Sequence, residues 1–345
     1  NYAMGKQSAN GGAVRAGRNT IFENCLFVKN GAIGGNGQNS STWENAEGGA
    51  IYSAGGWSNT GVKTVIVNST FDSNYVEVRT NNGEPRATDV FYGYGSNNDS
   101  QTMRAYIFNT IITGSYRMKG GGDNQGKAYT ENEKDEIFFA HANNNRIDVN
   151  YSIIGGSTDQ NWQDDNVYDI SPVYNNRSGE DYSLSILSPA IGQGTSSFES
   201  KSAPSIDILG NTRPNPSGST IDIGAYENVL STSTAPLPVQ GIVATAKTNS
   251  VALSWSAVKS SLTSSSNAEN IKYLIYQDDS QVGSSTTTSF TVPKLTNGAS
   301  YTFNVAAQDT STSLTGAPSN EITVTPVYNG PYWYVASSGG TASGT

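Results

Sequence analysis

The sequence predicts an all-β protein in which a solenoid of stacked short strands is followed by a separate β-sandwich. Three observations lead to this prediction. Only 14% of the 345 residues are charged, and 37 are glycine, a composition typical of secreted β proteins. A strand-forming segment recurs about every 41 to 44 residues in the first half of the chain. From about residue 236 onward, short segments alternate apolar and polar residues between turns.

The repeat consists of four segments, each centred on an asparagine. They begin at Thr20 (TIFENCLF), Thr64 (TVIVNSTF), Ala105 (AYIFNTII) and Arg146 (RIDVNYSI), and their asparagines are Asn24, Asn68, Asn109 and Asn150. Like residues stand three positions before each asparagine (Ile21, Val65, Tyr106, Ile147) and three after it (Phe27, Phe71, Ile112, Ile153). One repeat cannot offset the roughly 1–2 kcal/mol per residue lost in ordering its backbone, so the repeats are expected to stack.

The four asparagines are expected to form a structural ladder along one corner of the stack. Asparagine tolerates left-handed backbone at a corner, and stacked amides can hydrogen-bond between repeats. Gly-Gly pairs beginning at Gly11 and Gly48 would permit tight corners before a strand. Glu23 breaks a column that Val67, Phe108 and Val149 otherwise fill. Either Glu23 lies at the exposed end of the stack, or the register is shifted by one residue there.

The repeat motifs also carry a resemblance to a known family. GGAV…FENCLFVKN and GGAI…VNSTFDSN resemble the GGA(I/V) and FxxN repeats of bacterial polymorphic outer-membrane proteins, which are right-handed parallel β-helix proteins. The later segments SPAIGQG and SIDILGNTRPNPSGSTIDIGAYE are similar to the C-terminal cap of many bacterial secreted β-helix proteins. The resemblance implies a capped right-handed parallel β-helix over residues 1–230. The later repeats depart from it, with DVFYG and EIFFA in place of GGA.

A Ser/Thr/Pro-rich linker, residues 231–235, separates this part from a second module. Residues 236–327 resemble a fibronectin type III domain, a β-sandwich. The resemblance makes Trp255 the core tryptophan of the second strand and places Tyr301 in the tyrosine-corner position, both as structural core residues. The final segment, residues 328–345, is similar to the opening of β-helix proteins and implies the start of a further β-helix module.

Charge and composition exclude several function classes. The formal net charge of −9 disfavours nucleic acid as a partner, because its phosphates attract basic patches. The sequence contains no apolar run of membrane-spanning length, so we expect no membrane insertion in this segment. Cys25 is the single cysteine, which rules out an internal disulfide. The chain starts without a secretion signal, and we expect it to be a segment of a longer polypeptide.

Catalysis is considered because parallel β-helices include polysaccharide lyases and glycoside hydrolases. The lyase-type candidates are Glu136, Asp148 and Arg146, and similar charges stand at Asp89, Asp135, Lys63 and Arg104. No catalytic signature joins them, and solvated charges at strand ends are the alternative interpretation. His141 is the only histidine, which excludes a multi-histidine metal site. No cofactor is expected, although weak Ca²⁺ binding by an acidic loop stays open. Cys25 follows a corner asparagine, which favours packing over a nucleophilic role.

The function that these features favour is structural. We expect a segment of a large modular bacterial secreted or cell-surface protein, acting in adhesion or as a spacer and located outside the cell. Its partners would be extracellular glycans or proteins and neighbouring modules. Four aromatic residues in long loops could stack on sugars or pin their own loops: Trp43, Trp57, Tyr94 and Trp162. The alternatives are a β-helix polysaccharide lyase or glycoside hydrolase, and a building block of an extracellular filament.

Overall fold

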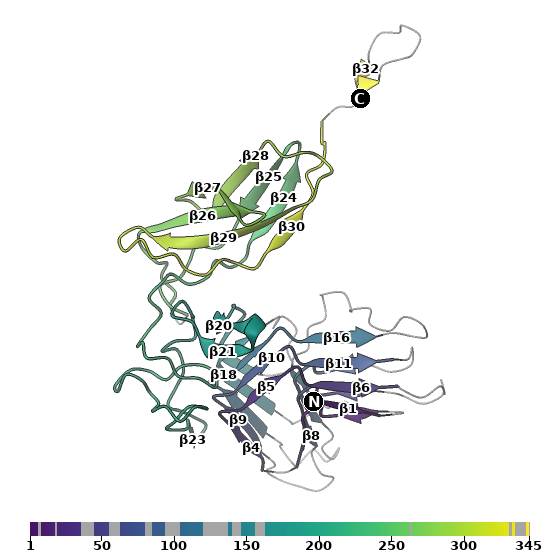
Figure 1. Ribbon diagram of the computed structural model, residues 1–345, viewed down its shortest axis with the longest axis vertical. Coiled ribbons are helices and arrows are strands. Elements are labelled where there is room, and N and C mark those ends of the chain that lie inside the picture. Colours follow the sequence, from purple (N-terminus) through teal and green to yellow (C-terminus); the bar gives the residue numbers. More distant parts are fainter. Residues whose placement is uncertain are drawn as a thin grey trace. The chain divides into compact units, whose positions relative to one another are not determined.

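The chain folds as two compact units, Asn1–Ser233 (unit 1) and Thr234–Thr345 (unit 2) (Figure 1). The boundary between the two units, at Ser233 and Thr234, falls within the segment 231–235 that was expected to be a linker. The computed structural model describes residues 1–5, 8–17, 19–35, 45–54, 63–79, 85–93, 104–119, 137–139, 146–155, 163–262, 264–330, 333–334 and 343–344. The described residues are almost all strands and turns, and their one helical element is the 3₁₀ turn η1 (Arg177–Gly179).

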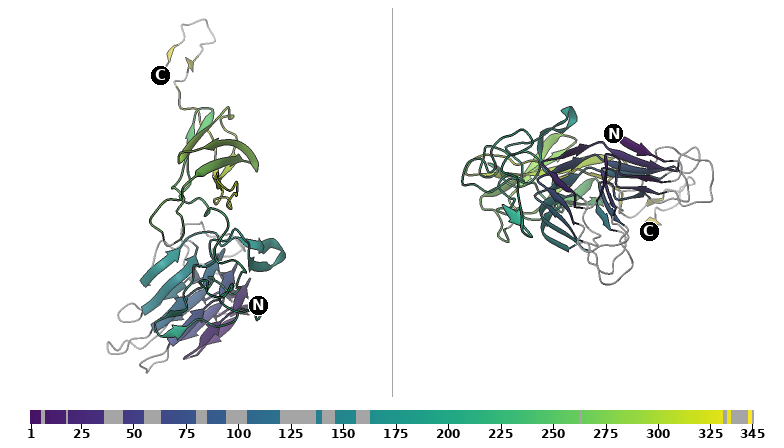
Figure 2. Two further views of the ribbon diagram at one scale, coloured as in Figure 1. Left: turned by 90° about the vertical axis from the view of Figure 1, so that its left-hand side faces the viewer. Right: turned by 90° about the horizontal axis from the view of Figure 1, so that it is seen from below.

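Unit 1 contains parallel sheets whose neighbouring strands come from successive repeats (Figures 1 and 2). The first sheet is β1 (Tyr2–Met4), β6 (Gly31–Gly34), β11 (Tyr75–Val78) and β16 (Tyr116–Lys119). The second is β3 (Val14–Ala16), β8 (Ile51–Ala54), β13 (Val90–Gly93) and β17 (Ile137–Phe139). The third is β2 (Ala9–Asn10), β7 (Ala46–Glu47) and β12 (Pro85–Arg86).

The largest sheet holds the strands on both sides of the corner asparagines. Its first half is β4 (Ile21–Glu23), β9 (Lys63–Val67), β14 (Arg104–Phe108) and β18 (Arg146–Ile154). Its second half runs back from β18 through β15 (Ile111–Thr113) and β10 (Thr70–Asp72) to β5 (Leu26–Val28). In addition, β19 (Gln163–Tyr168) pairs with β18. The fourth repeat therefore replaces two short strands and a corner by one strand of nine residues.

The core of unit 1 consists of columns of like side chains, one from each repeat. One column is Phe22, Ile66, Ile107 and Val149, another is Phe27, Phe71, Ile112 and Ile154, and a third is Val14, Ile51, Val90 and Ile137. The rings of Phe27 and Phe71 stack with centroids 4.7 Å apart. Each fully buried side chain of this kind contributes roughly 1.5–3 kcal/mol, so the columns are the main apolar stabilisation of the unit.

The fourth repeat corrects the register expected from the sequence. Phe108 pairs with Asn150, so Tyr151 is the residue opposite Asn109, and Tyr151 has the left-handed φ of 43°. The prediction that Asn150 continues the asparagine column is therefore wrong by one residue. The expected columns shift with it, because Ile147 and Ile153 give way to Asp148 and Ile154.

Glycine pairs occur at corners of unit 1 where backbone segments from neighbouring parts of the unit approach closely. A Cβ on Gly49 would lie 2.0 Å from the Thr88 carbonyl oxygen and 2.5 Å from that of Tyr75, and no side chain fits such a space. Gly48, the preceding residue, has φ of +68°. The third repeat turns the same corner with Ala87 at φ 53°, followed by Thr88 and Asp89. Asp89 thus occupies the position of the alanine in GGA.

A C-terminal segment of unit 1 covers outward-facing side chains of the largest sheet. It contains the antiparallel pairs β20 (Tyr174–Asn176) with β21 (Asp181–Leu184), and β22 (Ser197–Phe198) with β23 (Lys201–Ser202). Phe198 and Ala203 pack on an outward cluster made by Val65, Val67, Tyr106 and Phe108. The part that follows β21, residues 188–229, contains β22 and β23 and is called the capping segment below.

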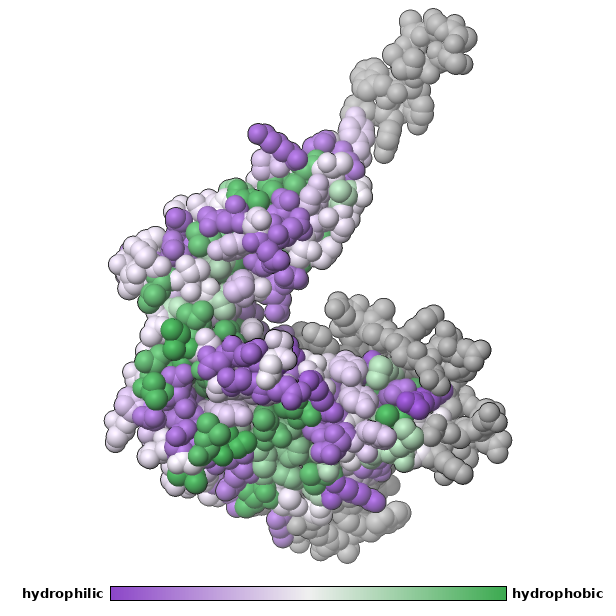
Figure 3. Space-filling view, in the orientation of Figure 1, coloured by the Kyte–Doolittle hydropathy of each residue, from purple (hydrophilic) through white to green (hydrophobic). Residues whose placement is uncertain are grey.

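The first repeat explains the irregular Glu23. β4 is the last strand of its sheet, and both Glu23 and Ile21 are exposed, Ile21 by 51%. In the next repeats the corresponding outward residues are buried beneath Phe198 and are apolar. Glu23 therefore lies at the end of the stack, in correct register with Val67. Figure 3 shows hydrophobic side chains gathered over the part of unit 1 where β4, β5 and β9 lie.

Unit 2 consists of two antiparallel sheets. One is β24 (Val243–Lys247), β25 (Ser250–Ser254) and β28 (Ser289–Pro293). The other is β27 (Ser280–Ser285), β26 (Ile271–Gln277), β29 (Tyr301–Asp309) and β30 (Ile322–Val324). A short pair, β31 (Trp333–Tyr334) and β32 (Ser343–Gly344), follows. Most of the predicted further module at 328–345 lies outside the described residues.

The core of unit 2 contains the two aromatic residues singled out from the sequence. Trp255 is 6% exposed and its ring meets that of Tyr273 edge-on, with centroids 5.3 Å apart. Tyr301 packs against the same core, and its hydroxyl accepts a hydrogen bond of 3.1 Å from the Thr296 backbone N–H.

Candidate functional site

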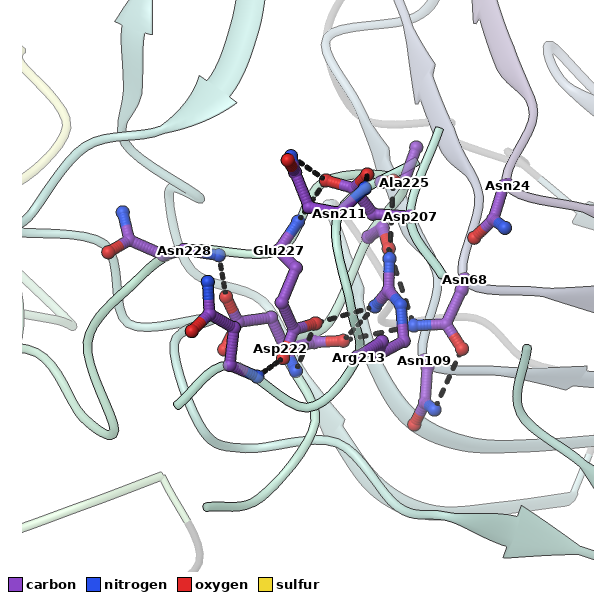
Figure 4. A network of polar contacts seen from close by, with 12 residues as sticks. Asn24, Asn68, Asn109, Asp207, Asn211, Arg213, Asp222, Ala225, Glu227 and Asn228 are labelled. Carbon is purple, nitrogen blue, oxygen red and sulfur yellow. Dashed lines mark hydrogen bonds and ion pairs between the residues drawn. The ribbon is translucent and has the colours of Figure 1, made fainter. Parts of the chain in front are cut away.

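The corner asparagines of unit 1 bind the capping segment. Asn24, Asn68 and Asn109 have left-handed φ values of 50°, 44° and 49°, which asparagine adopts at less cost than other residues with a Cβ. Asn109 Nδ2 donates to Asn68 Oδ1 at 3.1 Å, so the two amides are linked between repeats. Asn68 Nδ2 in turn donates to the Asp222 carbonyl oxygen at 3.0 Å (Figure 4).

The other ladder contacts also run to that segment. Asn24 Nδ2 donates to the Ile206 carbonyl oxygen at 2.7 Å. Asn109 Oδ1 accepts from the Thr195 N–H at 2.8 Å, and Asn109 Nδ2 donates to the Thr195 carbonyl at 2.7 Å. Asn68 and Asn109 are completely buried. The ladder is therefore an attachment site for residues more than 80 positions away in the chain, in addition to a link between repeats.

A buried ionic network lies directly behind these contacts in the capping segment (Figure 4). Arg213 Nη1 lies 3.0 Å from Glu227 Oε2, and both side chains are completely buried. Arg213 Nη2 donates to the carbonyl oxygens of Gly224 (3.3 Å) and Ala225 (3.2 Å), whereas Arg213 Nε is buried without a hydrogen-bond partner among the described residues. The Asp222 carbonyl thus accepts from both Arg213 Nη1 (3.2 Å) and Asn68 Nδ2. This shared acceptor couples the network to the ladder.

The carboxylates of the network accept backbone N–H groups that would otherwise be buried without partners. Asp222 accepts from Gly192 N at 2.7 Å and from Asn228 N at 2.6 Å. Glu227 Oε1 accepts from Asn215 N at 3.0 Å. Because an unpaired buried donor costs about 1–3 kcal/mol, these carboxylates fix the path of the capping segment.

Burial also perturbs the titration of the network. Burial, together with the charge of Glu227, raises the pKa of Asp222 to about 8. Burial likewise raises the pKa of Glu227, against the opposing effect of Arg213. Burial alone would raise the pKa of Asp207. Hydrogen bonds from Asn211 and from backbone N–H groups outweigh burial, so the pKa of Asp207 is lowered. Asp222 is therefore the protonated member of the group near neutral pH.

A second polar ladder, not predicted from the sequence, crosses the interior of unit 1. Asn30 Nδ2 donates to Asn74 Oδ1 at 3.0 Å, and Asn74 Nδ2 donates to Asp89 Oδ1 at 2.8 Å. Thr88 Oγ1 donates to Asp89 Oδ2 at 3.1 Å. Burial raises the pKa of Asp89 to about 7, although hydrogen bonds from Ser115, Asn74 and Thr88 act in the opposite direction. The spacing FxxN in FVKN and FDSN, which end at Asn30 and Asn74, was the feature that could have located this ladder.

The lyase-type candidates do not form a described catalytic group. Asp148 is 3% exposed, beside Tyr106 in register. Arg146 is the first residue of β18, and Glu136 lies outside the described residues. Asp89, another acidic candidate, is completely buried. Lys63, Arg104 and Arg146 occupy adjacent register positions where β9, β14 and β18 begin.

The other candidates from the sequence also form no catalytic or metal site among the described residues. Burial raises the pKa of the Cys25 thiol, which lies 3.3 Å from the Glu23 carbonyl, and a raised thiol pKa disfavours a nucleophile. Among the described residues, no three His, Cys, Asp or Glu side chains come together as a metal site. The absence of a cofactor stays a prediction. His141, Asp135 and the loop aromatics Trp43, Trp57, Tyr94 and Trp162 lie outside the described residues.

Comparison with known proteins identifies the second module. The model of the family "Fibronectin type III domain" matches residues 236–325, which confirms the prediction of such a domain. The solution structure of the fibronectin type-III domain of human fibronectin type III domain containing protein 3 is 19% identical, covering 28% of this chain and 91% of that chain with a TM-score of 0.25. No curated protein matches the sequence.

Two longer structures are also similar to part of the chain. The rat CD45 extracellular region, domains d3-d4, is 18% identical, covering 27% of this chain and 50% of that one with a TM-score of 0.22. Chitinase ChiA74 from Bacillus thuringiensis is 26% identical, covering 32% of this chain and 16% of that one with a TM-score of 0.23. This chain thus spans half or less of the length of each of these two structures.

In the part of the chain that the structure describes, no helix has the length and hydropathy needed to cross a bilayer.

Proposed function

We propose that this chain is a structural part of a large modular bacterial protein that is secreted or held at the cell surface, where it acts in adhesion or as a spacer. In this proposal residues 1–230 form a right-handed parallel β-helix with its own cap. The fibronectin type III domain of residues 236–325 supports the modular part of the proposal, since such domains are typical of modular extracellular proteins as spacers or binding modules.

The observation that carries the proposal is that the buried polar side chains of unit 1 make structural contacts within the unit. Stacked columns give a rod-like core, and the buried asparagines and the Arg213–Glu227 pair attach a capping segment to it. Asn68, Asn109 and the side chains of Arg213 and Glu227 are completely buried, so they are not displayed to a substrate. Asp89 and Asp148 are also buried, which disfavours the lyase or hydrolase alternative for the described carboxylates.

The filament alternative has one observation in its favour. β1 and β4 end their sheets, and the side chains of Tyr2, Met4 and Ile21 at that end are 64%, 45% and 51% exposed. Open strand edges can pair with another chain. Electron microscopy of the full-length parent protein distinguishes the possibilities, since filaments favour this alternative and single particles favour a spacer or adhesin.

Localisation of the parent protein tests the proposed function. Antibodies raised against this segment are expected to label the outside of intact producing cells or to detect the protein in the medium. Detection only after cell lysis would overturn the proposal.

Cysteine crosslinking tests the stacked architecture. Cys25 N donates to Ser69 Oγ at 3.2 Å, so a Ser69→Cys chain has two cysteines on adjacent repeats and is expected to form a disulfide on mild oxidation. A Thr110→Cys chain is the matched control, because residue 110 stands one repeat further along the column and should not crosslink to Cys25. Equal crosslinking of both chains would contradict the β-helix.

A further inference from the structure

The outer face of the first sheet of unit 1 carries a stripe of tyrosines. Tyr2, Gly31, Tyr75 and Tyr116 stand opposite one another on the neighbouring strands β1, β6, β11 and β16 (Figure 1). Ala32, Val76 and Val78 of the same strands belong to a buried cluster, so the alternate positions with the tyrosines face outward. Tyr2 is 64% exposed and Tyr116 is 44% exposed.

The tyrosine rings have a defined arrangement. The rings of Tyr75 and Tyr116 are nearly parallel, with an interplanar angle of 9° and centroids 5.3 Å apart. A Cβ on Gly31 would lie 2.1 Å from Cζ of Tyr75, so the Tyr75 ring lies over the Gly31 backbone. Glycine at this position makes room for the ring. The ring positions are thus fixed by sheet register and by a missing side chain.

Polar groups border the tyrosine stripe on the same face. Glu77, two residues after Tyr75, accepts from Arg79 Nε at 2.7 Å and from Arg79 Nη2 at 3.3 Å. These two charges neutralise each other. Burial raises the pKa of Tyr75 and of Tyr116, so both hydroxyl groups stay protonated at neutral pH. The face offers aromatic rings, hydroxyl donors and the guanidinium of Arg79, whose charge is paired with the buried carboxylate of Glu77.

We propose that the face carrying Tyr2, Tyr75 and Tyr116 binds uncharged polysaccharide. The exposed rings of Tyr2 and Tyr116 contact the apolar faces of sugars, and Arg79 hydrogen-bonds to sugar hydroxyls. Tyr75, which lies between Gly31 and Tyr116, holds the Tyr116 ring in place. Aromatic rings suit this role because they combine an apolar face with a polar edge. The net charge of −9 favours neutral glycans over acidic ones, which the chain repels. The inference rests on the adhesive role proposed above and names its ligand class and its surface.

Binding of the full chain to insoluble neutral polysaccharides tests this proposal. The panel is cellulose, xylan, chitin and mannan, with polygalacturonate as the acidic comparison. The wild type is expected to bind at least one neutral member more tightly than polygalacturonate. Tyr116→Ala should weaken that binding by about five- to tenfold, which corresponds to about 1–1.4 kcal/mol for loss of an aromatic contact. Tyr116→Phe keeps the ring and should stay within about twofold of wild type.

Two further variants separate the stripe from general effects. Gly31→Ala removes no aromatic group, but its Cβ displaces the Tyr75 ring, so it should also weaken binding. Tyr328→Ala in unit 2 removes a tyrosine that is 41% exposed, close to the 44% of Tyr116, and should leave binding unchanged. No binding to any neutral polysaccharide, a preference for polygalacturonate, or equal loss in Tyr116→Ala and Tyr328→Ala would overturn the proposal. Those results leave the cell-surface labelling test of the proposed function unaffected.

Discussion

Unit 1 buries amides, carboxylates and a guanidinium, whereas the interior of unit 2 is almost wholly apolar. Within the described ranges, Ser319 is the one buried residue of unit 2 that is neither apolar nor aromatic. In unit 1 the buried set includes Asn68, Asn109, Asp89 and Arg213. A sandwich closes its core with two apolar faces, while a stack of short strands has corners and ends where backbone groups need partners. Polar side chains supply those partners in unit 1.

This difference predicts different sensitivities. Loss of one partner in a buried polar network leaves the other uncompensated, and the resulting cost exceeds the net contribution of the contact itself. Unit 1 should therefore be sensitive to single polar substitutions and to pH. Unit 2 should depend chiefly on apolar volume around Trp255 and Phe303. The following predictions test that contrast, from the largest expected effect to the smallest.

Arg213→Ala should give the largest effect on unit 1. It leaves Glu227 buried without its ion-pair partner, and breaking such a pair costs about 3–5 kcal/mol. The measurement is urea unfolding, with hydrogen exchange to assign the loss to unit 1. Lys29→Ala is the matched control, since it breaks an ion pair of 2.6 Å whose side chains are 58% and 64% exposed, and it should leave the free energy of unfolding almost unchanged. Equal effects of the two variants would contradict the prediction.

Asp89→Asn should make unit 1 more stable above neutral pH. The pKa of Asp89 is raised from 3.8 to about 7 by burial, so the folded state holds a proton that the unfolded state releases at lower pH. The stability linked to this proton is fully present below about pH 4 and is lost as pH rises through 7. The loss accumulates between about pH 4 and pH 7 and totals roughly 4 kcal/mol at most, at about 1.4 kcal/mol for each unit of pKa.

Urea unfolding of the wild type and of Asp89→Asn from pH 5 to pH 9 measures this effect. The variant should exceed the wild type by only part of the full difference near pH 5 and by the full difference near pH 8. A residual decline with pH should remain, because the pKa of Asp222 is also raised, to about 8, by burial. Parallel pH profiles for the two proteins would show that Asp89 does not titrate in this range.

The sequence predicted the all-β fold and the fibronectin type III domain because both depend on local alternation and turn residues. It also placed Asn24, Asn68 and Asn109 in equivalent corner positions. It failed at Asn150, because β18 runs through the corner as a single strand and the left-handed residue there is Tyr151. A shift of one residue moves every side chain of a strand to the opposite face, so the error also misplaced Ile147.

The partners of the polar residues could not be predicted from the repeats alone. Asn68 and the Asp222 carbonyl it binds are 154 residues apart, and no local pattern connects them. Asp89 was grouped with surface charges because the third repeat has no GGA motif to mark the corner. Its burial follows from the register of Ala87–Asp89 with the glycine corner at 48–50. Long-range closure of the stack thus decides which polar residues are buried.

Asn68→Ala should destabilise unit 1 more than Asn24→Ala. The first change removes a completely buried amide that binds Asp222 and Asn109, at a cost of about 1–3 kcal/mol. The second removes one hydrogen bond to Ile206 near the exposed end and should cost about 0.5–1 kcal/mol. Thermal unfolding of the two variants gives the comparison. Equal losses would indicate that the ladder acts only through its left-handed corners, which both asparagines share.

Tyr301→Phe should give the smallest effect. It tests how far the stability of unit 2 depends on a single polar contact. It removes the hydroxyl that accepts the Thr296 N–H at 3.1 Å and leaves the ring in the apolar core. Because this contact is exposed, water can replace the hydroxyl, and the expected loss is at the low end of the range for a hydrogen bond, about 0.5 kcal/mol. Urea unfolding assigned to unit 2 by hydrogen exchange measures it. A loss as large as that of Arg213→Ala would mean that unit 2 also depends on a single polar contact, and the distinction between the two units would then rest on pH dependence alone.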